Sequence, residues 1–178
     1  MDDFKIIKAE KIYSGRVVGL SRETIVFPDG KEAVREIVQH PGASAMVPMI
    51  SPTEVILIKQ FRYSARKALW EIPAGTLEPG ETALVCAERE LVEEIGYRAG
   101  KMTPLGGFYT SPGFCNEFLH LFLATDLEQS ESNLDKDERL EVHKMPMQEA
   151  IRKIETGEII DAKTIVGLLR VSHMTGPT

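Results

Sequence analysis

The residues that most constrain what this chain can fold into are 75–97, GTLEPGETALVCAERELVEEIGY. A loop rich in Gly and Pro leads into them, and from Glu81 onward neither residue type recurs until Gly96, which predicts a helix. Three acids stand at positions i, i+3 and i+4 and therefore share one helical face: Glu90, Glu93 and Glu94. Apolar residues at helical spacing form a face that can pack on a core: Ala83, Leu84, Ala87 and Leu91.

Three carboxylates on one helical face repel each other, at a cost of ~0.2–0.5 kcal/mol for each exposed like-charge pair. A hard divalent cation removes this repulsion and uses the carboxylate oxygens as ligands. Taken alone, such a run is more often a solvated acidic face. The loop that precedes it favours the metal site.

The stretch resembles the Nudix box, the signature of the Nudix hydrolases. The matching positions are Gly75, Glu81, Arg89-Glu90-Leu91, Glu93-Glu94 and Gly96. The one departure is Tyr97, which stands where an aliphatic residue is usual. The resemblance implies an α/β/α sandwich around a mixed sheet, in which the box forms a loop, a helix and a second loop. It also implies hydrolysis of the pyrophosphate bond of a nucleoside diphosphate linked to another group, with Mg²⁺ or Mn²⁺ as the cofactor.

The same resemblance assigns roles within the box. Glu90 and Glu94 become the principal metal ligands, and Glu93 becomes a catalytic acid and a further or water-mediated ligand. The backbone carbonyl of Ala74 is another expected ligand. Arg89 is expected to orient the neighbouring carboxylates, with an ordinary helix ion pair as the alternative. Mg²⁺ keeps several of its waters, so few protein ligands suffice.

The family resemblance implies that an acid in a loop after the box closes over the substrate as general base or extra metal ligand, and the acidic residues 126–141 match this loop. By its spacing to the following strand, Glu138 fits best, both as the base and as an extra metal ligand. The loop offers other acids, and a purely solvated loop is the alternative for each of them: Asp135, Asp137 and Glu141.

Features outside the box resemble the ADP-ribose pyrophosphatase group of the family. Pro112 lies 16 residues after Gly96, at the position that marks this group. Four short motifs agree with it: HPGA at 40–43, KQFR at 59–62, WEIPAG at 70–75 and KTI at 163–165. The expected reaction is therefore hydrolysis of ADP-ribose to AMP and ribose 5-phosphate. Another nucleoside diphosphate sugar, such as GDP-mannose, is the alternative substrate, and a sensor that binds ADP-ribose without cleaving it is less favoured.

The group resemblance also implies residues that bind substrate, with Pro112 in the loop that meets it. Arg35 and Arg62 match arginines that contact phosphate or the terminal ribose, groups that suit a guanidinium. Glu117 matches an acid that hydrogen-bonds ribose hydroxyls. For each of these three charged residues, a surface charge is the alternative.

Length, charge and cysteine content limit the number of domains, the kinds of partner and the compartment that this chain can have. The 178 residues fit one domain with a small accessory element. The net charge of -6 argues against a nucleic-acid partner or an anionic membrane surface. The charged N-terminus and the absence of a long apolar run predict a cytoplasmic protein. Cys86 and Cys115 do not make a disulfide framework, and Cys86 is expected to be a buried thiol.

The expected fold class is α/β, with a Nudix domain over residues 41–178 and a small antiparallel sheet over residues 1–40. Its strands are expected at 12–18, 24–27 and 33–38, the last two joined by a turn at Pro28-Asp29-Gly30. A sheet this small is seldom stable alone, and the resemblance implies that it pairs two subunits in a swapped homodimer. An aromatic residue of this sheet is expected to stack on adenine, although core packing is the commoner role for each candidate: Phe4, Tyr13 and Phe27.

Strands and helices within residues 41–178 are predicted from the pattern of apolar and capping residues. Dense apolar runs predict buried strands at 43–50 and 55–60. Further strands are expected at 106–110, 117–124 and 141–145, and a helix at 147–155. Asp161 is the expected N-cap of a last helix that runs to about residue 170.

Overall fold

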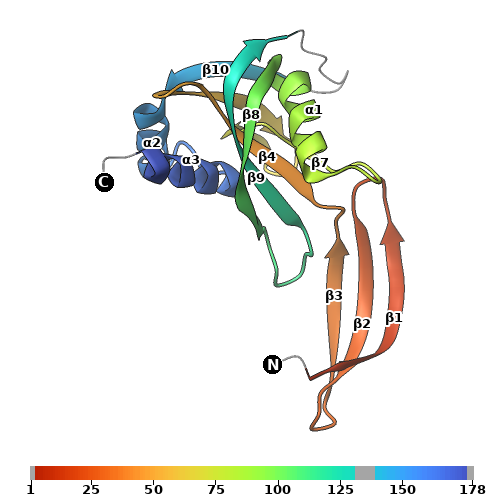
Figure 1. Cartoon of the computed structure of the whole chain (residues 1–178). Helices are drawn as coiled ribbons and strands as arrows, with labels where there is room; N and C mark the ends of the chain where they lie inside the picture. Colours follow the sequence, from red (N-terminus) through yellow and green to blue (C-terminus); the bar gives the residue numbers. More distant parts are fainter. Residues whose placement is uncertain (1–2, 131–138, 176–178) are drawn as a thin grey trace. The chain divides into compact units, whose positions relative to one another are not determined.

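The computed structural model describes residues 3–130 and 139–175 (Figure 1). The chain divides into two compact units, each of which is described by itself. The first contains the N-terminal segment up to Gly42 together with Tyr109–Phe118. The second contains Ala43–Phe108 and the chain from Leu119 onward.

A three-stranded antiparallel sheet builds the first unit. Its strands are β1 (Lys5–Ser14), β2 (Gly19–Val26) and β3 (Glu32–Gln39), in the order β1-β2-β3. The predicted hairpin between β2 and β3 is confirmed: Gly30 has a φ of 82°, which glycine adopts without strain. The predicted strand at 12–18 is wrong, because β1 ends at Ser14 and the Gly15 amide then donates to the carbonyl of Val18 in a turn.

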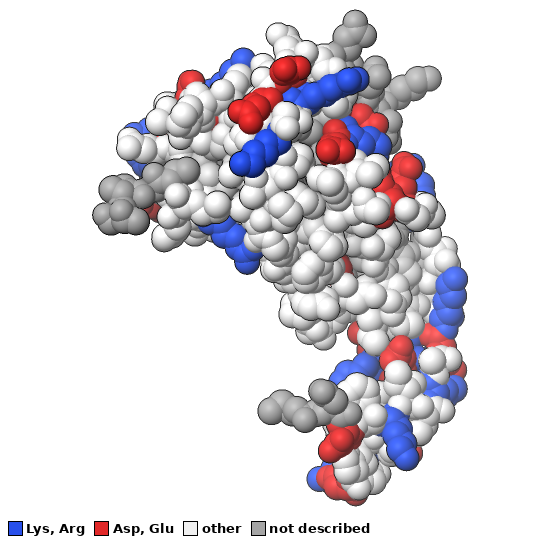
Figure 2. Space-filling model, in the orientation of Figure 1, with Lys and Arg blue, Asp and Glu red and all other residues white. Residues whose placement is uncertain are grey.

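This sheet carries ion pairs and exposed apolar side chains together. Figure 2 shows Lys and Arg side chains beside Asp and Glu side chains over it. Glu10 pairs with Lys8 at 2.7 Å and with Arg22 at 2.8 Å. Ile25 is buried, whereas several large apolar side chains are exposed: Phe4, Ile6, Ile7, Ile12, Tyr13 and Val34. The sheet therefore leaves apolar surface uncovered within one chain.

A seven-stranded mixed sheet forms the second unit. Its strands are β4 (Ala43–Ser51), β5 (Glu54–Arg62), β6 (Lys67–Glu71), β7 (Ala74–Thr76), β8 (Tyr97–Tyr109), β9 (Phe118–Gln129) and β10 (Leu140–Pro146). The main path runs β10-β5-β4-β9-β8, with β6 paired to β5 and β7 to β4. The pairing of β4 with β9 is parallel and that of β4 with β5 is antiparallel, which confirms the mixed sheet.

Helices cover both faces of this sheet (Figure 1). They are α1 (Ala83–Ile95), α2 (Met147–Glu155) and α3 (Ala162–Thr175). Successive side chains of a strand point to opposite faces. Met46 of β4 accordingly packs in one apolar cluster with Leu91 of α1, while its neighbour Val47 packs in the other cluster with Leu168 of α3. The expected α/β/α sandwich is therefore confirmed.

Some boundaries differ from the sequence expectation. The strand expected at 106–110 is the end of β8, which begins at Tyr97, directly after the box helix. Residues 126–129 belong to β9 rather than to an acidic loop. Asp161 caps α3 as predicted, since its Oδ2 accepts from the Thr164 amide at 3.0 Å, but the helix continues to Thr175. Within the described ranges, no helix has both the length and the apolar character needed to cross a membrane.

Candidate active site

Residues 75–97 start at the end of β7 and continue through a loop and α1 to the first residue of β8. Thr82 caps α1, and its side-chain oxygen accepts from the Val85 amide at 3.3 Å. Gly96 ends the helix in the left-handed conformation, with a φ of 69°. The helix starts at Ala83, so Glu81 lies outside it, directly before the capping residue Thr82.

Arg89 is the centre of the acidic cluster. Its Nε and Nη2 donate to the two carboxylate oxygens of Glu81 at 2.9 and 3.1 Å. Its Nη1 donates to Glu90 Oε1 at 2.7 Å and to Glu93 Oε2 at 2.8 Å. The hydrogen bond to Glu81, with those to the other two acids, raises the pKa of Arg89 above its ordinary value. One guanidinium thus offsets the repulsion among three carboxylates and fixes their directions.

A close backbone approach positions Glu90. A Cβ added at Gly75 would lie 1.6 Å from Glu90 Oε1, so only glycine leaves room for this carboxylate. The buried Cys86 thiol lies beneath the same loop, 3.5 Å from the carbonyl oxygen of Gly75. Burial raises the pKa of Cys86 to about 12, so the thiol stays protonated and donates. The expectation of a buried free thiol is confirmed.

Glu94 joins the end of the helix to the strand that enters the box. Its side chain is buried, and its Oε2 accepts from the Ala74 amide at 2.9 Å. Ala74 in turn pairs with Ala45 in the central sheet. The structure therefore brings two of the expected ligand residues, Ala74 and Glu94, into direct contact.

The chemistry of these donors fits a hard divalent cation. Carboxylate and carbonyl oxygens are the ligands that Mg²⁺ and Mn²⁺ prefer. Because Gly75 has no side chain, the Glu90 carboxylate can lie directly against the backbone of the loop. In residues 3–130 and 139–175, no group of three or more acidic, His or Cys side chains converges as a ready metal site. Glu90 and Glu93 are instead held by Arg89.

The expected general base lies outside the described residues. Glu138, Asp135 and Asp137 all fall within 131–138, so their place relative to the box stays a prediction. The fourth acid considered, Glu141, is exposed on β10, and its Oε2 lies 3.2 Å from His143 Nε2.

Arg62, expected to bind substrate, sits at the end of β5 in a bidentate pair with Glu71 of β6. Its Nε and Nη2 donate to the two oxygens of Glu71 at 2.7 and 2.6 Å. The hydrogen bonds to Glu71 raise the pKa of Arg62, and the charge of Glu94 contributes to this shift. Arg62 therefore lies within electrostatic range of one box carboxylate, that of Glu94.

The other expected substrate residues belong to the first unit. Arg35 and Pro112 line one pocket of about 440 Å³, together with two aromatic residues, Tyr109 and Phe114. Glu117 does not line this pocket; it accepts from Thr110 Oγ1 at 2.6 Å and lies 3.6 Å from His40 Nδ1.

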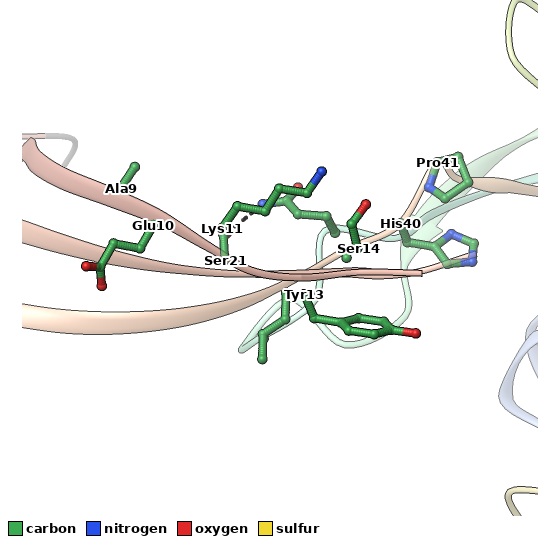
Figure 3. A pocket seen from close by; sticks show the side chains of 11 residues that line it. Ala9, Glu10, Lys11, Tyr13, Ser14, Ser21, His40 and Pro41 are labelled. Carbon is green, nitrogen blue, oxygen red and sulfur yellow. Dashed lines mark hydrogen bonds between the residues drawn. The ribbon is translucent and has the colours of Figure 1, made fainter. Parts of the chain in front are cut away.

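The aromatic candidates of the small sheet line two further pockets. One, of about 670 Å³, contains Tyr13 and His40 (Figure 3). Figure 3 shows Lys11 and Tyr13 on opposite sides of β1, in agreement with the register shift between them. The other pocket, of about 550 Å³, contains Phe4 and Phe27. The expectation of core packing is wrong for Phe4 and Tyr13, which are exposed.

The sequence interpretation missed two groups of residues. Glu71 and Lys163 form a buried ion pair. Both residues lie in motifs, WEIPAG and KTI, that mark the group but do not indicate that these two side chains meet. Tyr109 and Phe114 also line the pocket of Arg35, a role that no local pattern in the sequence indicates.

The pair of Glu81 and Arg89 predicts an acid-sensitive contribution to stability. The hydrogen bond from Arg89 lowers the pKa of Glu81 from 4.5 to about 2. Because the folded value lies below the unfolded one, this stabilisation is complete above pH 4.5 and is lost as the pH falls toward 2. We therefore expect Glu81→Gln to lower the free energy of unfolding at neutral pH, and its difference from wild type to shrink in acid.

Urea unfolding with EDTA at neutral and at acid pH measures this difference. Glu88→Gln is the matched control, since Glu88 is exposed on the same helix. A Glu81→Gln effect that stays constant with pH would show that the ion pair is not its source.

Comparisons with known proteins place this geometry in a family. The family model of the NUDIX domain matches residues 40–166. The ADP-ribose pyrophosphatase of Bacillus subtilis (strain 168) is 44% identical over 162 residues, covering 90% of this chain and 88% of that protein. The methanol dehydrogenase activator of Bacillus methanolicus is 41% identical over 166 residues, covering 92% and 90%.

A solved structure agrees on the fold. The crystal structure of an ADP compounds hydrolase aligns with a TM-score of 0.86 over 98% of this chain and 95% of its own, at 22% sequence identity. The family match spans more than half of the chain, and the same residues build the loop, helix and acidic cluster described above. The protein therefore belongs to the Nudix family.

Proposed function

We propose that this protein hydrolyses the pyrophosphate bond of ADP-ribose to AMP and ribose 5-phosphate, with Mg²⁺ or Mn²⁺ as its cofactor. The observation that carries the proposal is the box cluster. Arg89 holds Glu90 and Glu93, Glu90 lies against Gly75, and Glu94 accepts from the Ala74 amide. The similarity to a relative named ADP-ribose pyrophosphatase supports the choice of substrate.

Glu90 and Glu94 would hold the cation, with Glu93 and the carbonyl of Ala74 as further ligands. When bound, the cation supplies charge for the pyrophosphate oxygens and lowers the pKa of an attacking water. The water oxygen bonds to one phosphorus as the bridging P–O bond breaks, and a carboxylate takes the proton. We assign this base to Glu138, assisted by Glu93. Arg89 holds the carboxylates in position through its hydrogen bonds rather than contacting substrate.

We propose substrate-binding roles for the residues that match the ADP-ribose pyrophosphatase group. Arg62 would donate to phosphate through Nη1, the guanidinium nitrogen that the bidentate pair with Glu71 does not use. Arg35 and Pro112 would meet the nucleotide, and Glu117 would accept from ribose hydroxyls. The aromatic rings of Tyr109 and Phe114, which share the pocket of Arg35, add stacking surfaces for a base.

We propose that residues 1–40 pair two copies of the chain into a homodimer, while residues 41–178 form the Nudix domain. The exposed apolar side chains of the three-stranded sheet, such as Ile6 and Ile12, support this arrangement. We expect light scattering to give twice the 19.8 kDa mass of one chain. Replacing both isoleucines by Asp should shift the mass toward that of the monomer. A monomeric wild-type protein would contradict the pairing.

A substrate panel tests the proposed reaction directly. We expect the purified protein with Mg²⁺ to give its highest kcat/KM on ADP-ribose, with AMP as a chromatographically identified product. The comparison substrates are GDP-mannose, ADP-glucose, UDP-glucose, NADH and diadenosine polyphosphates. Addition of EDTA should abolish turnover, because no charge then offsets that of the pyrophosphate.

The panel also distinguishes the alternatives. A higher kcat/KM on GDP-mannose or another nucleoside diphosphate sugar would keep the box chemistry and overturn the substrate assignment. Binding of ADP-ribose without turnover would indicate a sensor instead.

A further inference from the structure

A buried network outside the carboxylate cluster fastens residues 71–74, the segment that leads into the box. The amide of Ile72 donates to Thr164 Oγ1 at 2.8 Å, and the Thr164 hydroxyl donates to Asp161 Oδ2 at 2.6 Å. The same Asp161 oxygen accepts from Lys163 Nζ at 3.0 Å. Thr164 is fully buried, so its hydroxyl is satisfied on both sides by protein groups. The start of α3 therefore holds the backbone at Ile72.

Glu71 is the second point of attachment. Its side chain is 1% exposed and accepts from Lys163 Nζ as well as from the guanidinium of Arg62. Buried ion pairs of this kind are weak evidence for stability, because apolar residues of equal volume often stabilise as well or better. The cluster instead fixes relative positions. Its three charged side chains come from β5, β6 and α3, and they can meet only when these elements are correctly placed against each other.

The fastened segment reaches the carboxylate cluster at its other end. The carbonyl of Pro73 accepts from the Met46 amide at 3.1 Å, and the Ala74 amide donates to Glu94 Oε2 at 2.9 Å. Each position from 71 to 74 thus has a restraint, and α3 supplies the first two. A shift of α3 would move the same backbone that meets Glu94.

We propose that Thr164 and Lys163, oriented by Asp161, are positioning residues for the cation and phosphate sites of this enzyme. Thr164 sets the backbone that places Ala74 against Glu94, and Lys163 sets Glu71 and, with it, Arg62. The inference rests on the proposed function, because it takes Glu94 and Ala74 as ligands of the cation and Arg62 as a ligand of phosphate. It gives the KTI motif a role within the site.

Direct binding of Mn²⁺ tests the Thr164 part without relying on turnover. Thr164→Val keeps the shape of the side chain but removes both hydrogen bonds of the hydroxyl. We expect it to weaken Mn²⁺ binding, measured by electron paramagnetic resonance, about 10-fold or more, the range for groups that orient metal ligands. Thr164→Ser should restore binding, because the hydroxyl returns. Thr156→Val, at the end of α2, is the control. It also removes a hydroxyl, but the Thr156 hydroxyl bonds to the Lys153 carbonyl and to Glu158 and not to the segment that leads into the box.

A second variant covers the case in which Thr164→Val fails to fold. Asp161→Asn still caps α3, because Asn is as good an N-cap as Asp, but it weakens the hold on Lys163 and Thr164. We expect weaker Mn²⁺ binding and a higher KM for ADP-ribose, with a smaller change in kcat. Unchanged Mn²⁺ affinity and KM in folded variants of an active wild-type enzyme would overturn this inference alone. A wild-type protein that binds no Mn²⁺ would overturn the proposed function and the inference with it.

Discussion

Replacing Glu94 by Gln is expected to reduce kcat/KM on ADP-ribose about 10²- to 10³-fold, the range seen when one preorganised electrostatic group is removed. The amide oxygen of Gln can still accept from the Ala74 amide, as Glu94 Oε2 does at 2.9 Å. The link between helix and strand is therefore preserved, while the negative charge for the cation is lost. Steady-state kinetics and Mn²⁺ binding should both show the loss, with little change in the thermal unfolding midpoint.

A matched substitution on the same helix separates the loss of a metal ligand from the loss of one negative charge elsewhere on α1. Glu88→Gln removes the same charge from an exposed position and should leave kcat/KM within about 2-fold of wild type, as surface changes usually do. Turnover in Glu94→Gln equal to that of wild type would remove Glu94 from the set of metal ligands. A large fall in the unfolding midpoint would instead assign Glu94 a mainly structural role.

The sequence predicted those parts of the fold that depend on local pattern. The dense apolar runs around Val47 and Leu57 are confirmed as β4 and β5, because buried strands need apolar side chains on both faces. The first part of β8 was missed because Gly100 and Pro104 both disfavour a strand. Pro104 lies in the edge strand of the main path, the place in a sheet where proline is accepted because amides on the outer side bond to no neighbouring strand.

The candidate site likewise contains residues that the local sequence pattern predicted and residues that it could not predict. Spacing along one helix was enough to find Glu90, Glu93 and Glu94, since i, i+3 and i+4 positions always share a face. No local rule could pair Glu71 with Lys163, which are 92 positions apart. Their contact depends on how α3 packs on the sheet. The partners that position a site are thus harder to predict than the residues that perform its chemistry.

Gly75→Ala is expected to reduce kcat/KM about 10²-fold, the cost of a displacement of roughly 1 Å at a reacting centre. The new methyl group would lie 1.6 Å from Glu90 Oε1 and 1.9 Å from its Cδ, so the carboxylate must leave its place. Because the clash is with the end of a side chain that can rotate away, we expect a small loss of stability. Activity and Mn²⁺ affinity should fall far more than the unfolding midpoint.

Gly157→Ala is the comparison variant, for which we expect a loss of stability without a loss of turnover. Gly157 has a φ of 75°, yet a Cβ there would meet nothing within 4 Å. The left-handed conformation should cost about 1–2 kcal/mol of stability, while the box remains untouched and turnover persists. Activity lost without stability at Gly75, and stability lost without activity at Gly157, would show that the box glycine serves to seat Glu90. If Gly75→Ala retained wild-type turnover, Glu90 could not be a ligand that depends on this close approach.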